Sequence, residues 1–236
     1  MSRIIKILCR IMAVLTSLWV LKPAVDVYAD TGKTYHSKTG AYLIAQCEFF
    51  AWVAEQAGRF RDSGGSMEQF IDIFKKQSVN DEPQVKEDKI NNAQVGAELA
   101  YEMPSLSPQE LRNLAMTACI KDQIIRMAKY QGHQIAIVRS CGIDSLEHET
   151  LVNEIFQLLT TDATILAAGR KQMQDSIETA LGQITKINAT IPWSVDDYRQ
   201  RVCTQEMLDG FKRTISSLAS DKQELLEHIA KDKRNR

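Results

Sequence analysis

The spacing of the cysteines is the feature that most constrains how this chain can fold. Cys9 lies near the start, and the other four cysteines are Cys47, Cys119, Cys141 and Cys203. An even number of cysteines in an exported chain favours disulfide bridges over free thiols. Four cysteines allow three pairings, and none of these four forms the Cys-x-x-Cys motif that is typical of redox enzymes and zinc sites.

Two segments lead to a cysteine through the same series of signals. Before Cys119, Ser107 can cap a helix, Pro108 suits its first position and Glu110 suits its third. Residues 191–203 repeat the proline, the serine and the acidic residue before their own final cysteine. A device that is used twice to place a cysteine is more typical of a scaffold than of an active site.

This repetition favours a local pairing of the cysteines. We predict that Cys47 pairs with Cys119 and that Cys141 pairs with Cys203. Each bridge would close a loop of roughly 60–70 residues and stabilise the fold by about 4 kcal/mol, because it removes entropy from the unfolded chain.

Residues 1–29 have the layout of a secretory signal peptide. Basic residues precede a mostly apolar run from Ile11 to Leu21, and Val27 and Ala29 suit the −3 and −1 positions of a cleavage site. An uncleaved membrane anchor is the alternative, but a span needs about 20 apolar residues and Lys22 ends this run too soon. We expect cleavage after Ala29, and a periplasmic or secreted chain without a transmembrane span.

Composition predicts an all-α fold. Hydrophobic residues make up 44% of the chain and charged residues 25%, which is enough for a globular core. With 11 glycines and 5 prolines, the chain has few of the residues that form the turns of a many-stranded sheet. The formal net charge is −1, so no excess of charge argues for a nucleic acid or a membrane surface as partner.

Helical periodicity predicts the elements of the first half, residues 41–131. After a flexible stretch at 30–40, the expected elements are a helix at 41–60, a helix that follows a Ser66–Gln69 capping box, a loop at 78–88, a helix at 89–101 and a long helix from Pro108. In the first helix, Phe49, Phe50 and Trp52 form an aromatic cluster that we interpret as core rather than as a ligand pocket.

The helix that starts at Pro108 is predicted to continue through Gly132 to Val138. Alternatively, the chain breaks at Gly132 and residues 135–138 form a short strand, but no turn cluster surrounds this glycine. The second half, residues 132–236, should add a helix capped by Asp144 with Glu147, a helix at 165–187, a helix from Ser194 to Cys203 and an amphipathic helix over 208–229. The halves form either two small helical lobes that share the long central helix or a single disulfide-stapled helical bundle, and the sequence leaves both open.

No residue pattern points to catalysis, a cofactor or a metal ion. The histidines are scattered, and each is interpreted as a lone surface residue: His36, His133, His148 and His228. His148-Glu149 begins like a metalloprotease motif, but Val152 stands where the second zinc ligand should be. No nucleophile motif is present, so the sequence favours a binding protein over an enzyme.

Three residues mark candidate binding surfaces. Trp193 is interpreted as a hydrophobic staple beside a helix start, with an exposed anchor as the alternative. The C-terminal helix is amphipathic, carries Phe211 on its apolar side and ends in a basic tail that contains Arg234. We expect this helix to pack on its own chain, with a partner helix or an anionic surface as the alternative.

The signal peptide, the cysteine in the first helix, the turn at 61–65 and the helix start at 107–111 resemble the layout of small exported helical proteins of bacteria. We expect a periplasmic protein that binds a protein partner in the cell envelope, as an adaptor, an inhibitor or an accessory factor. The alternatives are a periplasmic hydrolase without a recognisable motif and a carrier of an apolar ligand between helices.

Overall fold

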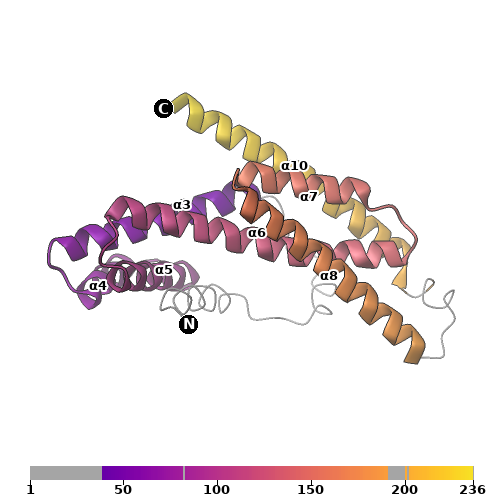
Figure 1. Cartoon of the computed structure of the whole chain (residues 1–236), viewed down its shortest axis with the longest axis horizontal. Coiled ribbons are helices and arrows are strands. Elements are labelled where there is room, and N and C mark those ends of the chain that lie inside the picture. The colour runs from indigo at the N-terminus through magenta and orange to yellow at the C-terminus, as the bar shows by residue number, and fades with distance from the viewer. Residues whose placement is uncertain (1–38, 82, 191–199, 201, 236) are drawn as a thin grey trace. The chain divides into compact units, whose positions relative to one another are not determined.

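The computed structural model describes residues 39–81, 83–190, 200 and 202–235, and these residues confirm the predicted all-α fold. In chain order (Figure 1), the helices are α3 (Thr39–Asp62), α4 (Met67–Gln77), α5 (Pro83–Glu102), α6 (Pro108–Ser140), α7 (Leu146–Leu159), α8 (Ala163–Thr190) and α10 (Gln205–Asn235). The predicted signal peptide, the stretch at 30–38 and the cap at Ser194 lie outside the described residues. None of the described helices is long and apolar enough to cross a membrane.

Both predicted disulfides are present. Cys47 is bonded to Cys119 with a Cα–Cα distance of 5.5 Å, and Cys141 is bonded to Cys203 with a Cα–Cα distance of 5.7 Å. These separations lie within the ordinary range for a bridge. The fold is therefore a disulfide-stapled helical one.

The described chain divides into two compact units. Unit 1 comprises residues 45–119, and unit 2 comprises residues 39–44 and 120–235. The division falls between Cys119 and Ile120, whereas the sequence placed a boundary after residue 131. Because α3 and α6 each continue across this division, neither helix belongs to one unit alone.

Two capping boxes begin helices of unit 1, as predicted. At α4, the Gln69 N–H donates to Ser66 Oγ, and the Ser66 N–H donates to Gln69 Oε1. At α6, the Glu110 N–H donates to Ser107 Oγ at 3.3 Å, and the Ser107 N–H donates to Glu110 Oε2 at 2.8 Å. Each box satisfies N–H groups that have no partner inside the helix.

The predicted loop at 78–88 is too long, because α5 begins at Pro83 rather than at Lys89. Proline suits the first turn of a helix, where its missing N–H would have had no partner. Pro83 therefore begins a helix, whereas the sequence predicts a loop at this position.

Arg61, in the last turn of α3, ties the end of this helix to the end of α5. Its Nη1 donates to the carbonyl oxygens of Ala100 and Met103 at 2.6 and 3.1 Å, and its Nη2 donates to the carbonyl of Leu106 at 2.9 Å. The last carbonyls of a helix have no partner inside it, so a guanidinium there serves as a cap. Gly64 completes the turn with a φ of 87°, a conformation that favours glycine. Arg61 and Gly64 of the predicted turn at 61–65 therefore have structural roles, as a helix cap and as a turn residue.

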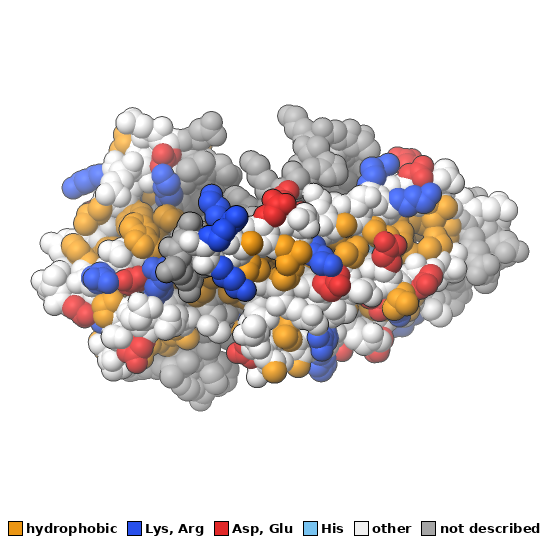
Figure 2. All heavy atoms as spheres, turned by 90° about the horizontal axis from the view of Figure 1, so that it is seen from above, with side chains coloured by type: hydrophobic (Ala, Val, Ile, Leu, Met, Phe, Trp, Pro, Cys, Tyr) orange, Lys and Arg blue, Asp and Glu red, His pale blue; other side chains and the backbone are white. Residues whose placement is uncertain are grey.

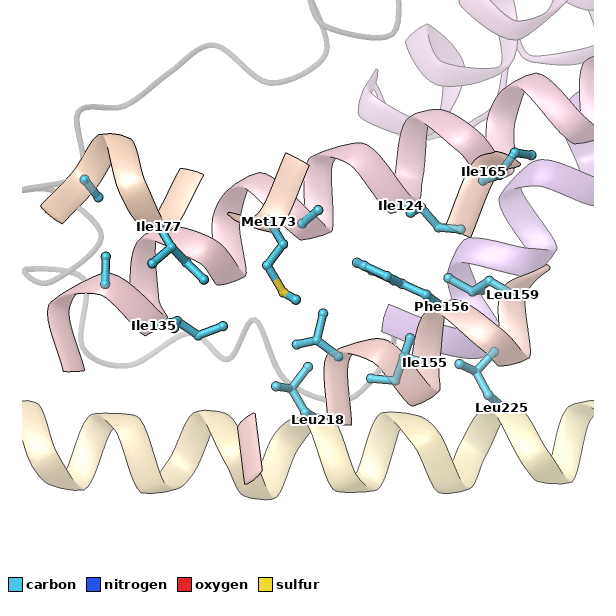
Figure 3. Packing of buried hydrophobic residues seen from close by; sticks show 14 residues of the cluster. Ile124, Ile135, Ile155, Phe156, Leu159, Ile165, Met173, Ile177, Leu218 and Leu225 are labelled. Carbon is cyan, nitrogen blue, oxygen red and sulfur yellow. The ribbon is translucent and has the colours of Figure 1, made fainter. Parts of the chain in front are cut away.

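The core of unit 2 gathers apolar side chains from α6, α7, α8 and α10 (Figure 3). In this view Leu218 and Leu225 of α10 point toward α7, which carries Ile155 and Leu159, and the ring of Phe156 extends away from α10 toward Met173 and Ile124. Lys222 Nζ of α10 also donates to Glu154 Oε2 of α7 at 2.9 Å. The C-terminal helix therefore packs on its own chain, as expected.

Gly132 does not break α6, so the alternative strand at 135–138 is wrong. A Cβ atom at this position would lie 2.6 Å from the carbonyl oxygen of Met173 and 2.8 Å from Ser176 Cβ, both on α8. Glycine is needed here because the backbones of α6 and α8 approach closely, not because the chain turns.

This contact predicts opposite effects for two glycine substitutions. Gly132→Ala should lower the free energy of unfolding by about 1–3 kcal/mol, because its methyl group meets the backbone of α8. Gly182→Ala, on α8 with nothing within 4 Å of its Cβ position, should raise it by about 0.5–1 kcal/mol through helix propensity. Urea unfolding of both variants measures this, and equal effects would show that α6 and α8 do not meet at Gly132.

Candidate functional site

Helices α3 and α4 of unit 1 border a shallow depression in the surface. Its volume is about 310 Å³. The lining residues come from α3, the turn after it and α4: Gln56, Arg59, Phe60, Ser63, Phe70 and Ile73. No acidic side chain is among them.

An aromatic cluster holds these two helices together beside the depression. The ring of Phe70 lies 5.8 Å from that of Phe60 and 5.2 Å from that of Phe74. Trp52 stacks on Phe49 and meets Phe74 edge-on, with centroid distances of 5.9 and 6.3 Å. Such tilted and offset arrangements are the favourable ones for aromatic pairs.

Part of this cluster faces solvent. Trp52 is 42% exposed and Ile73 is 39% exposed. The prediction that Phe49, Phe50 and Trp52 belong to the core therefore holds for Phe50, which is buried, and is wrong for Trp52. Trp52 lies at the margin of the apolar stripe of α3, where only the neighbouring helix decides whether a side chain is covered. We call Trp52, Ile73 and the depression the α3–α4 surface.

A cluster of charged groups stands at the edge of the α3–α4 surface. The buried carboxylate of Glu55 accepts hydrogen bonds from Arg112 Nη1 at 2.9 Å and from Arg59 Nη2 at 2.7 Å. These bonds, that from Arg112 first, hold the pKa of Glu55 below its usual range. Two guanidinium groups against one carboxylate leave a net positive charge here, and the Arg59 side chain is largely exposed.

His148 of unit 2 is a second distinctive group, and its interpretation as a surface residue is wrong. Its side chain is completely buried, and its ring lies 5.3 Å from that of Phe211 on α10. Its Nε2 lies 2.6 Å from Gln131 Oε1 on α6. Because a carbonyl oxygen only accepts, Nε2 carries the proton, and Nδ1 has no hydrogen-bond partner among the described residues.

Burial determines the charge state of His148. Removal from water disfavours the imidazolium and lowers the pKa of His148 to about 4, although the carboxylate of Glu149 acts in the opposite direction. At neutral pH His148 is therefore an uncharged part of the core. Helical spacing gave a signal for this, because residues 148, 152, 155 and 159 lie on one face of α7.

The hydrogen bonds at the start of α7 agree only in part with the predicted cap. Asp144 does accept the N–H of Leu146, at 3.0 Å, but Glu149 rather than Glu147 is the second carboxylate at this helix start. Glu149 Oε1 accepts from Ser145 Oγ and, at 2.6 Å, from Arg139 Nη2. The prediction was wrong about Glu147, because Arg139 at the end of α6 pairs with Glu149 instead.

None of the predicted site residues that the structure describes is among the residues of the α3–α4 surface. The four paired cysteines are in bridges. Phe211 is half-buried against His148, and Arg234 is exposed in the last turn of α10. Trp193 lies outside the described residues. Across the described part of the chain, no three His, Cys, Asp or Glu side chains gather as metal ligands would.

Charges of both signs are interspersed on the face shown in Figure 2, where groups of Lys and Arg alternate with Asp and Glu. Comparison of the chain with protein-family models, curated proteins and solved structures found no match. The function proposed below therefore rests on the residues of this chain.

The burial of His148 predicts a loss of stability in acid. Between pH 6.5, the ordinary pKa, and about 4, the unfolded chain binds a proton at this residue that the folded chain does not. The contribution of His148 is thus present above pH 6.5 and falls by up to about 3 kcal/mol as the pH drops through this window.

Urea unfolding at pH 7 and pH 4.5 tests this effect against other titrating groups. His148→Gln should reduce the difference between the two pH values by about 2 kcal/mol, because glutamine does not titrate. His133→Gln, at an exposed position of α6, should keep the difference of the parent chain. If all three proteins lose the same free energy in acid, His148 is not the group responsible.

Proposed function

We propose that this protein is exported and acts by binding another protein through the α3–α4 surface. Export is supported by the signal-peptide layout of residues 1–29 and by two disulfides, which persist mainly in oxidising compartments. The role is that of an adaptor, an inhibitor or an accessory factor in the cell envelope.

The observation that carries this proposal is the exposure of Trp52 and Ile73 next to the depression. Exposed apolar side chains that lie together, with polar groups around them, are typical of interaction sites. Tryptophan and arginine are also the residues that most often contribute large binding energies at interfaces. The α3–α4 surface has both, in Trp52 and Arg59.

The chemistry of the surface suggests what it would hold. Phe60 and Phe70 give the depression an apolar lining that suits an aliphatic or aromatic side chain, as in the binding of an amphipathic helix. The net positive charge of Arg59 and Arg112 around Glu55 suits a carboxylate next to that side chain. A protein segment with an apolar anchor beside an acidic residue meets both conditions.

Site-specific cross-linking in the envelope of the producing cell tests this proposal. A photoreactive amino acid at Ile73 should give a discrete cross-linked species, whereas the same amino acid at Leu146 should not. Leu146 is the matched control because it is also an exposed hydrophobic residue, at 67%, and lies in unit 2.

Substitution then tests which side chains matter. Trp52→Ala should reduce the yield of the Ile73 product at least tenfold, which corresponds to about 1.4 kcal/mol of binding energy. Leu146→Ala should leave the yield unchanged, and a cooperative melting transition above the temperature of the experiment would show that each variant is folded. Identical products from positions 73 and 146, or no product from either, would contradict a binding role for the α3–α4 surface.

A further inference from the structure

The two disulfides differ in their access to solvent. Cys47 is 1% exposed and Cys119 is 4% exposed, so the first bridge is buried in unit 1. Cys141 and Cys203 are both half-buried, so the second bridge reaches the surface. Reduction requires a thiolate to approach a sulfur atom directly, and access therefore decides which bridge reacts first.

The accessible bridge fastens the beginning of α10. Cys141 follows the last residue of α6, and Cys203 comes shortly before Gln205, where α10 begins. The bridge thus joins the end of one helix to the start of another across 62 residues of sequence.

The two ends of α10 are held differently. From residue 218 onward, Leu218 and Leu225 are buried in the core, and Lys222 pairs with Glu154 of α7. In residues 205–217, Met207 is buried and Phe211 is half-buried where it covers His148. Residues 205–217 therefore depend more on the bridge than the rest of the helix does.

We propose that Cys141–Cys203 is a redox-sensitive bridge, which a dithiol opens before Cys47–Cys119 and which then releases the start of α10, residues 205–217, from His148. One thiolate of the dithiol attacks a sulfur of the bridge and forms a mixed disulfide. The second dithiol sulfur displaces the remaining cysteine. The protein gains two thiols, with two electrons and two protons, and the dithiol leaves as a cyclic disulfide.

The consequence for His148 follows from its surroundings. Phe211 covers the ring from α10, Gln131 holds Nε2 from α6, and Glu149 is its charged neighbour on α7. When Phe211 leaves, water reaches an imidazole whose Nδ1 has no partner in the closed state. Reduction thus exposes to water the imidazole of His148, which is buried in the oxidised protein.

Differential alkylation tests the order of opening. The mature protein is treated with increasing dithiothreitol, quenched with N-ethylmaleimide and mapped by peptide mass spectrometry. We expect Cys141 and Cys203 to be labelled at a concentration at least tenfold below the one that labels Cys47 and Cys119. Simultaneous labelling of all four, or earlier labelling of Cys47 and Cys119, would overturn the proposal.

Limited trypsin digestion of the selectively reduced protein tests the release of α10. Cleavage after Lys212 or Arg213, both exposed in the first half of α10, should become at least tenfold faster than in the oxidised protein. Cleavage after Arg170 or Lys171, exposed on α8, should not change. Selective reduction without faster cleavage at 212 and 213 would show that the bridge does not hold this segment.

A variant checks the same release without reductant. Oxidised protein that carries Cys141→Ser and Cys203→Ser should show the fast cleavage at 212 and 213 and keep the slow cleavage at 170 and 171. Fast cleavage at all four positions would mean that the bridge supports the whole of unit 2, which would also overturn the proposal. The reduced parent protein gives an answer even if the variant does not fold.

Discussion

Two covalent bridges that involve one helix determine how the rest of this protein holds together. α6 carries Cys119 within it and is followed directly by Cys141. The first joins α6 to α3 in unit 1, and the second joins its end to the segment before α10 in unit 2. Because each bridge restricts the unfolded chain, two modest helical cores can each be stable without the large buried surface of a bigger domain.

Two buried ionisable side chains, Glu55 of unit 1 and His148 of unit 2, are accommodated in opposite ways. Glu55 keeps its charge, because two guanidinium groups compensate for its removal from water. His148 loses its charge, because burial disfavours the imidazolium and the hydrogen bond to the Gln131 carbonyl needs only the neutral ring. A lowered carboxyl pKa and a lowered histidine pKa both favour the folded chain at neutral pH over acid, so these two residues act in the same direction as the pH falls.

The apolar face of α3 is wider than its neighbours can cover. One side of it, with Cys47 and Phe50, is buried in unit 1, while Trp52 lies at the border and remains partly exposed. Ile73 of α4 is also partly exposed. The aromatic cluster that packs α4 against α3 also contains Trp52, an exposed residue of the α3–α4 surface. Helix packing and the proposed binding therefore depend on the same side chain.

By itself the sequence determined the helical class, the disulfide pairing and the helix starts at Ser66 and Ser107, because these depend on composition, spacing and hydrogen bonds within one turn. Only the tertiary structure decided that His148 is buried and that Trp52 is exposed. The side-chain pattern of a single helix shows which face is apolar, but the neighbouring helices decide how much of that face is covered. The same reason explains Gly132, whose role depends on the approach of α8 and not on its local sequence.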